Sequence, residues 1–320
     1  MFHVEHSVLT SKLFHVEHWQ LYKMETLTNC LLCNTPLPVN PYITACDHLV
    51  SGETFNIVRC EKCTFLLTNP RPQADEIKHF YQSEAYISHT DKSRSPDDIL
   101  YHQVKRFMLK RKLRLLKKHT TTKQVNILDF GCGTGGFLQA AGKAGFRAEG
   151  FEPGEVAKRV AMDKGLSLYE NHETLFKKGA HKYDMITLWH VLEHIHDFPV
   201  ILDKFYTLLA DNSFLLIAIP MVNSYDAQHY KQFWAAYDVP RHLYHFSRKT
   251  IIKACKNAGF KLIDKQPMVF DSYYVSLLSE KHRGSKIPFL KAFYHGSVSN
   301  LNALFNKSPW SSEVFVFKKY

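Results

Sequence analysis

The stretch VNILDFGCGTGG, residues 125–136, decides the fold of this chain. It opens with a short, largely apolar run typical of a buried strand, and residues 137–143 beyond it have a helical pattern. The glycines let the backbone turn sharply and bring amide groups and a helix N-terminus close to a ligand. Strand, glycine loop and helix in this order predict the cofactor site of an α/β fold, although the spacing alone also suits a dinucleotide.

Two carboxylates flank this loop in the sequence. Asp129 comes directly before the glycines, where its negative charge suits an amino group and disfavours a pyrophosphate. Glu152 and Pro153 end the next expected strand about 20 residues on, where a ribose diol requires an acid. A further buried strand, 183–189, runs into the segment HVLEH, residues 190–194.

With these features, residues 125–220 resemble the class I methyltransferases, especially the ubiquinone-type O-methyltransferases, whose fourth strand leads into the same HVLEH segment. The resemblance implies an α/β, Rossmann-like fold with a mostly parallel seven-stranded sheet and helices on both faces. It implies S-adenosyl-L-methionine as the cofactor and a small-molecule methyl acceptor as the partner. The cofactor-binding residues that it implies are Asp129, Gly131, Cys132, Gly133 and Gly135 around the methionine half, Glu152 with Pro153 at the ribose, and His190 at the cofactor's edge.

Histidines near the expected strand ends are the candidate catalytic residues. Methyl transfer needs a base only when the acceptor is, for example, a hydroxyl or an acidic carbon, and a histidine removes such a proton near neutral pH. We predict His190, His194 and His242 for this role, with packing or backbone hydrogen bonds as the alternative for each. Arg241 could bind an anionic acceptor or pair with Asp238.

The remaining elements of the predicted methyltransferase-like domain, 124–320, follow from pattern. Ser247 is the expected cap of a helix over 248–258. Residues 213–220, 260–264 and 313–317 are predicted as strands, and 272–311 as a helical insertion that covers the sheet or the pocket.

Two Cys-x-x-Cys pairs stand in a small module before this domain, residues 24–72. Cys30, Cys33, Cys60 and Cys63 have the spacing of a zinc ribbon, and four thiolates close a tetrahedral site of the structural kind. Reduced thiols without metal are the alternative, and Cys46 or His48 could compete as a ligand. Metal binding would substitute for a core that so short a segment cannot build.

Residues 73–123 form a predicted helical linker or cover with a dense basic face. One interpretation is a solvated helix face beside the sheet, and the other is a surface for RNA or a phosphorylated substrate. The basic residues are Lys105, Arg106, Lys110, Arg111, Lys112, Arg114, Lys117 and Lys118.

The N-terminal leader, residues 1–23, contains the repeat FHVEH at 2–6 and 14–18. The codons for this peptide can form an inverted repeat that resembles the chromosome-partition site bound by the ParB family. We therefore expect a non-native or disordered leader, translated from intergenic DNA, with Met24 as the true start.

Bulk composition excludes several classes. The chain has 320 residues, a net charge of +11 and no apolar run near the roughly 20 residues that a membrane span needs. Without an export signal, we predict a cytoplasmic protein whose seven cysteines do not form a disulfide framework.

The favoured function is O- or C-methylation of a sugar, phenol or similar metabolite. The alternatives are an RNA methyltransferase that uses the four-cysteine module and the basic helix, and a noncatalytic protein that binds the cofactor or a partner.

Overall fold

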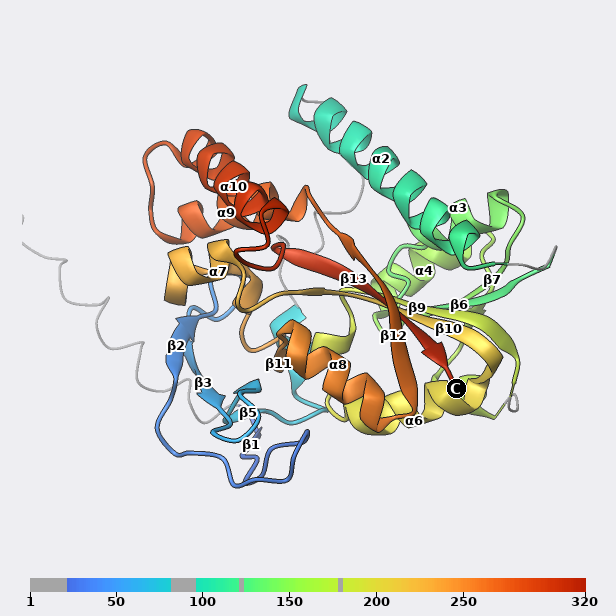
Figure 1. Ribbon diagram of the computed structural model, residues 1–320, viewed down its shortest axis with the longest axis horizontal. Helices are drawn as coiled ribbons and strands as arrows, with labels where there is room; N and C mark the ends of the chain where they lie inside the picture. Colours follow the sequence, from blue (N-terminus) through green and yellow to red (C-terminus); the bar gives the residue numbers. More distant parts are fainter. Residues whose placement is uncertain (1–21, 82–95, 121–123, 178–180) are drawn as a thin grey trace, which may run out of the picture.

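The computed structural model describes residues 22–81, 96–120, 124–177 and 181–320 (Figure 1). Within these residues, seven strands form one sheet whose only antiparallel member is β13. This confirms the predicted fold class. The order across the sheet is β12 (Phe260–Pro267), β13 (Ser312–Lys319), β10 (Leu209–Pro220), β9 (Tyr183–Trp189), β6 (Asn126–Phe130), β7 (Arg147–Phe151) and β8 (Leu168–Tyr169). Almost all of the predicted leader, residues 1–21, lies outside the described residues.

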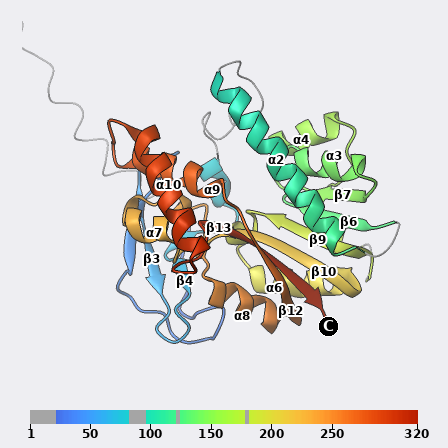
Figure 2. The same cartoon turned by 45° about the horizontal axis from the view of Figure 1, so that its top comes forward.

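Helices cover both faces of this sheet (Figure 2). One face carries α2 (Pro96–Lys118), α3 (Gly136–Lys143) and α4 (Glu155–Asp163), and the other carries α6 (Phe198–Leu208) and α8 (Arg248–Asn257). The short α5 (His172–Phe176) follows β8. In α6, Phe198, Ile201, Leu202 and Phe205 recur at helical spacing and are buried, which explains why this segment packs as a helix on the sheet. Ser247 caps α8 as expected, accepting a hydrogen bond from the amide of Thr250.

A group of helices stands at one end of the molecule, at the upper left of Figure 1. It consists of α7 (Tyr225–Tyr230), η4 (Lys231–Phe233), η5 (Ala235–Tyr237), α9 (Asp271–His282) and α10 (Pro288–Leu304). Of these, α9 and α10 occupy most of the region predicted as a helical insertion. They connect β12 to β13, so they lie beside the edge of the sheet where the parallel strands end.

The cysteine module is built into the same structure. Its strands are β1 (Met24–Glu25), β2 (Ile43–Cys46), β3 (Thr54–Arg59), β4 (Leu66–Thr68) and β5 (Arg71–Pro72), followed by η2 (Ile77–Tyr81). A strand from far along the chain, β11 (Tyr244–His245), completes its four-stranded sheet by pairing with β4. Cys30, Cys60 and Phe65 share one apolar core with Leu188 and Phe246, so the module and the sheet domain are packed as one unit.

Candidate cofactor and acceptor site

The glycine loop between β6 and α3 has a backbone that only glycine adopts easily. Gly131, Gly133 and Gly135 have φ values of 75°, 55° and 77°. A Cβ on Gly131 would lie 2.5 Å from Cγ2 of Val191, and one on Gly135 would lie 2.2 Å from Cδ1 of Leu166. The loop is therefore fixed by its conformation, as its sequence predicted, and also by its close neighbours.

Asp129 lies at the end of β6, directly before the loop, and its side chain is buried. The hydroxyl of Thr187 on β9 donates a 2.7 Å hydrogen bond to its Oδ1. Burial raises the pKa of this carboxyl to about 6, against the opposing influence of Thr187 and the Lys112 ammonium. A buried carboxylate of this kind favours a positively charged group of a ligand as its partner.

Lys112 reaches this site from α2. Its ammonium stands 4.1 Å from the centre of the Trp189 ring, at the end of β9. Burial lowers the pKa of Lys112 to about 8, although Asp129 and Asp271 favour the charged form. This residue was predicted only as part of the basic face of the helix. A signal was present, because Lys112 interrupts the apolar stripe formed by Met108, Leu115 and Leu116.

Glu152 follows β7 on the other side of the loop. Its two carboxylate oxygens accept hydrogen bonds from the amides of Gly133, at 2.7 Å, and Gly154, at 2.8 Å. Burial raises its pKa. The next residue, Pro153, is exposed. These bonds tie the acid to the glycine loop, so the two parts of the predicted cofactor site form one structure.

Cys132 stabilises the glycine loop through its backbone amide and through the small size of its side chain. Its amide and that of Gly131 both donate to the carbonyl of Phe151, at 3.0 and 2.7 Å. Burial raises the pKa of its thiol, which keeps the thiol protonated. The side chain fills the space beside Gly150, where an added Cβ would lie 2.8 Å from its Sγ.

His190 follows β9 and has an unusual backbone conformation, with φ at 59°. Its Nε2 lies 3.2 Å from Oδ2 of Asp271, and its Nδ1 lies 3.6 Å from Oε1 of Glu193. Burial opposes the charged form, but these two carboxylates raise the pKa of His190 to about 9. In this structure His190 is therefore an imidazolium at neutral pH, which suits holding an anion better than removing a proton.

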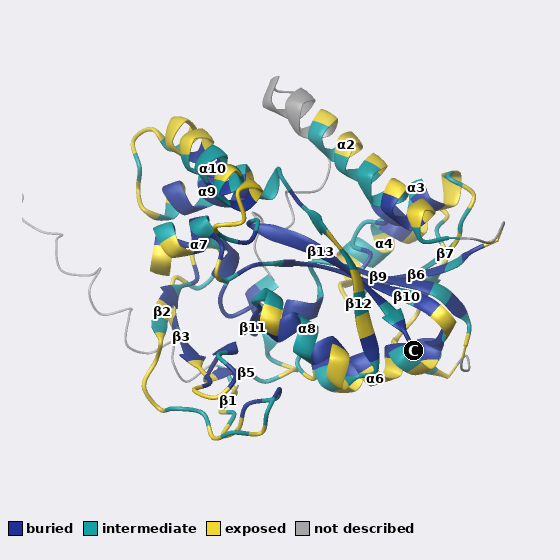
Figure 3. Ribbon diagram, in the orientation of Figure 1, coloured by how far each residue is buried: buried dark blue, intermediate teal, exposed yellow. Residues whose placement is uncertain are grey.

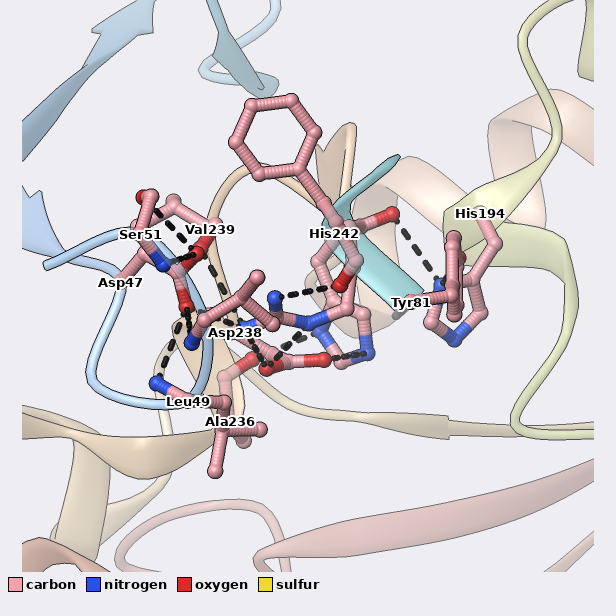
Figure 4. Close-up of polar contacts among 12 residues, drawn as sticks. Asp47, Leu49, Ser51, Tyr81, His194, Ala236, Asp238, Val239 and His242 are labelled. Carbon is pink, nitrogen blue, oxygen red and sulfur yellow. Dashed lines mark hydrogen bonds and ion pairs between the residues drawn. The ribbon is translucent and has the colours of Figure 1, made fainter. Parts of the chain in front are cut away.

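The structure brings His194 and His242 together, with ring centroids 4.5 Å apart (Figure 4). Nδ1 of His194 lies 3.1 Å from the carbonyl of Arg241 and 2.9 Å from the hydroxyl of Tyr81. Nδ1 of His242 lies 2.9 Å from the carbonyl of Ala236. Because a carbonyl only accepts, each Nδ1 carries a proton, and Nε2 is the nitrogen of each ring that is left to exchange one.

Glu193 lies beside these two rings. Its side chain is 1% exposed, and no described residue donates a hydrogen bond to either carboxylate oxygen. Burial opposes ionisation, but His190, His242 and His194 lower its pKa overall. Burial, with some help from His242, lowers the pKa of His194 to about 4, so this ring is neutral at physiological pH. The group thus places the buried carboxylate of Glu193 beside two imidazole rings, of which His194 is neutral.

Arg241 lies in the interior, and both of its acidic partners are close. Its guanidinium stands 2.8 Å from Oδ1 of Asp47 in the cysteine module and 2.8 Å from Oδ1 of Asp238. It also donates to the carbonyl of Phe80 at 2.9 Å. Figure 4 shows Asp47 and Asp238 on facing segments. Of the two roles considered for Arg241, the structure contains the ion pair, and it links the module to the sheet domain.

The four predicted metal ligands form one cluster. Sγ of Cys30 lies 3.4 Å from that of Cys63, and Sγ of Cys33 lies 3.5 Å from that of Cys60. Four thiolates at about 2.3 Å from one zinc ion stand roughly 3.8 Å apart, so this arrangement fits a closed tetrahedral site. Cys46 is outside the cluster, since its thiol contacts the carbonyl of Gly52.

His48 is also outside the cysteine cluster and stacks on His282. Two further groups in the described part of the chain have metal-binding residue types within 4.8 Å of one another. They are Glu193 with His194 and His242, and His229 with Glu280 and His295.

At least two members of the basic face of α2 have partners on other elements of the described chain. Lys112 points to the cofactor site, as described above, and Lys118 lies 2.7 Å from Oδ2 of Asp264 on β12. Among the helices of the described chain, none is long and apolar enough to cross a membrane.

Comparison with known proteins gives a consistent family. A sequence model described as a methyltransferase domain matches residues 100–265. The ubiquinone biosynthesis O-methyltransferase of Citrobacter koseri is 36% identical over 78 residues, which are 22% of this chain and 32% of that protein. Its counterpart in Salmonella enteritidis is 35% identical over 78 residues, with the same coverage. The match therefore spans about a third of the length of these curated relatives.

Two solved structures are also similar to this chain. A Haemonchus contortus phosphoethanolamine N-methyltransferase 2 in complex with S-adenosyl-L-methionine is 19% identical, with a TM-score of 0.48, covering 79% of this chain and 62% of that one. A SAM-dependent methyltransferase from Archaeoglobus fulgidus is 18% identical, with a TM-score of 0.46, covering 70% of this chain and 100% of that one.

Proposed function

This chain belongs to the methyltransferase-domain family, and from that premise we propose that it is an S-adenosylmethionine-dependent methyltransferase acting on a small-molecule acceptor. The observation that carries the proposal is the glycine loop between two acids, Asp129 and Glu152, where β6 and β7 end. Ligands of parallel α/β sheets bind at this edge.

The residues present fit the charges of the cofactor. Its methionine end carries an ammonium and a carboxylate, and Asp129 and Lys112 offer the two opposite charges near each other. Asp129 would hold the amino group, Lys112 the carboxylate, and Glu152 the ribose hydroxyls. The loop of Gly131 and Gly133 would lie with its backbone against the ligand. When bound, the cofactor supplies a methyl group on a sulfonium, which is already activated for transfer to a nucleophile.

For the acceptor, we propose a proton-transfer role for the Glu193 cluster, defined as Glu193, His194 and His242. The Nε2 atom of each ring is the one that can exchange a proton, and the carboxylate of Glu193 partly offsets the burial that disfavours an imidazolium at His194. A hydroxyl or an acidic carbon of a sugar, phenol or similar metabolite is the matching acceptor group. His190, charged at neutral pH, would orient the developing oxyanion through its partly exposed ring.

We also propose that Cys30, Cys33, Cys60 and Cys63 hold a structural zinc ion. The group offers four thiolates and no fifth donor of its own. Its role is to fix the module on which β11 and the Asp47 partner of Arg241 depend.

Calorimetry with S-adenosylmethionine tests the cofactor assignment. Asp129→Ala and Glu152→Ala should each weaken binding by about tenfold or more, whereas Asp163→Ala, at an exposed acid of α4, should leave it unchanged. Unchanged affinity in both site variants would overturn the assignment.

Transfer of a labelled methyl group to a panel of hydroxylated metabolites tests the reaction. His194→Gln and His242→Gln should lower kcat by about 100-fold and leave cofactor affinity within twofold. Full turnover in both variants would remove the Glu193 cluster from the chemistry.

A further inference from the structure

The helix α10 buries small residues and exposes large apolar ones, which is the reverse of an ordinary surface helix. The face that packs on α9 carries small residues, Ala292, Gly296, Ser299 and Ala303, all of which are buried. At Gly296 the approach is close, since an added Cβ would lie 2.6 Å from the ring of Tyr273. A surface helix normally buries its large apolar residues and exposes polar ones.

The large apolar residues of this helix lie on the other side. We call them the outward face of α10, and each is between 52% and 68% exposed. The members are Leu290, Phe293, Tyr294, Leu301, Leu304 and, at the C-cap, Phe305. Ile287 just before the helix and Phe289 in its first turn are also more than half exposed. Figure 3 shows these exposed stretches at the upper left, at the end of the molecule away from α3 and α4. A contiguous apolar surface of this kind marks an interaction site.

The charge of the residues around the outward face of α10 indicates which kind of partner it can bind. From residue 281 to residue 312 the sequence contains five Lys or Arg residues and no Asp or Glu. Lys286 and Lys307 stand near the two ends of α10 and are exposed, and Lys291 lies on its flank. A second copy of this chain would bring the same positive charge against itself. An anionic surface would be attracted.

We propose that the outward face of α10 docks on the surface of a bilayer that contains anionic phospholipids. The apolar side chains would enter the boundary between headgroups and acyl chains, and the terminal lysines would contact the phosphates. The helix would lie in the plane of the membrane surface and not cross it, in keeping with the absence of a spanning helix in the described residues. This inference rests on residues outside the proposed cofactor site and does not depend on the reaction.

Co-sedimentation of the full chain with vesicles tests the proposal. Vesicles of phosphatidylcholine with one-third phosphatidylglycerol should bind the protein, more weakly as salt rises, and pure phosphatidylcholine vesicles should bind it much less. The variant Leu290→Ser/Phe293→Ser should lower the partition by at least about tenfold. The variant Lys286→Ser/Lys307→Ser should lower it roughly 25-fold, since each lysine near such a surface is worth about fivefold.

The matched control is Val156→Ser/Met162→Ser, which removes two apolar residues of α4 that are 60% and 55% exposed. It should bind the anionic vesicles within twofold of the wild type. All variants should keep their S-adenosylmethionine affinity, which separates a failure of docking from a failure of the proposed function. Absent or equal binding to both vesicle types would overturn the proposal. So would a dimer, seen by light scattering, that Leu290→Ser/Phe293→Ser dissociates.

Discussion

Replacing Asp129 with asparagine should stabilise the ligand-free protein while weakening its cofactor binding. The carboxyl of Asp129 is buried at the end of β6, and its pKa is raised from 3.8 to about 6. A pKa difference of this size means that ionising the group costs the folded state about 3 kcal/mol relative to the unfolded chain. Asparagine has nearly the same shape and keeps an oxygen that can accept the hydrogen bond from Thr187.

The sign and the pH window follow from that shift. Since the folded state holds this proton more tightly than the unfolded chain, the contribution of Asp129 to wild-type stability falls as pH rises from about 4 to about 6. The stability gain of Asp129→Asn over the wild type should therefore be smallest near pH 4 and reach about 3 kcal/mol above pH 7. Cofactor affinity should change in the opposite direction, because a neutral amide no longer attracts the amino group.

Urea unfolding of both proteins at several pH values, without ligand, measures the difference directly. Calorimetry with S-adenosylmethionine at pH 7.5 measures the loss of affinity. Asp163→Asn, at an exposed acid of α4, is the control for the loss of a surface carboxylate. A stability difference between Asp129→Asn and the wild type that is the same at pH 4 and pH 8 would refute the reasoning, as would undiminished cofactor affinity.

Four further outcomes can be checked. Lys112→Met should weaken S-adenosylmethionine binding about tenfold by calorimetry, and wild-type affinity should decline as pH rises through about 8, where this ammonium loses its proton. Cys60→Ser should abolish the single zinc ion expected by elemental analysis and lower the melting temperature of the whole chain, because the module shares its core. Arg241→Met should cost about 3–5 kcal/mol in urea unfolding, since it removes the cation that pairs with the buried Asp47 and with the partly exposed Asp238; a neutral result would argue against the ion pairs. Gly131→Ala should abolish cofactor binding by strain and by contact with its neighbour, whereas Gly136→Ala, where an added Cβ meets nothing within 4 Å, should not.

Local features of this protein could be predicted from its sequence. The glycine loop and the cap at Ser247 depend on residues within a few positions of each other, and the structure has both. The mostly parallel sheet was implied by the resemblance to the class I methyltransferases, and it was confirmed. The grouping of the four cysteines followed from their paired spacing, although the metal itself stays a prediction.

Features that depend on distant segments could not be predicted in the same way. His194 and His242 meet where the amide of Leu243 donates to the carbonyl of Glu193, a contact between segments about 50 positions apart in the chain. The sequence suggested a pair between Arg241 and its neighbour Asp238. The second partner, Asp47, lies 194 positions away, and no local pattern predicted this contact. Lys112 was counted in the basic face of its helix because it has charged neighbours in sequence, whereas its position in the apolar stripe turns it inward. The roles of the catalytic histidines and of the cofactor residues stay predictions.

The pairing of β4 with β11 joins two segments that the ribosome makes at well-separated times. The hydroxyl of Thr68 donates to the carbonyl of His242, which the ribosome adds 174 positions later. At 5–20 residues per second this interval is roughly 10–35 s, during which the nascent cysteine segment lacks its edge strand. Cys30 and Cys63 are made much closer together in time, so we expect metal loading to come first and to protect these thiols until the strand arrives. A fragment that ends before β11 would lack this edge strand permanently. The N-terminal module should therefore be studied in the full chain and not as an isolated fragment.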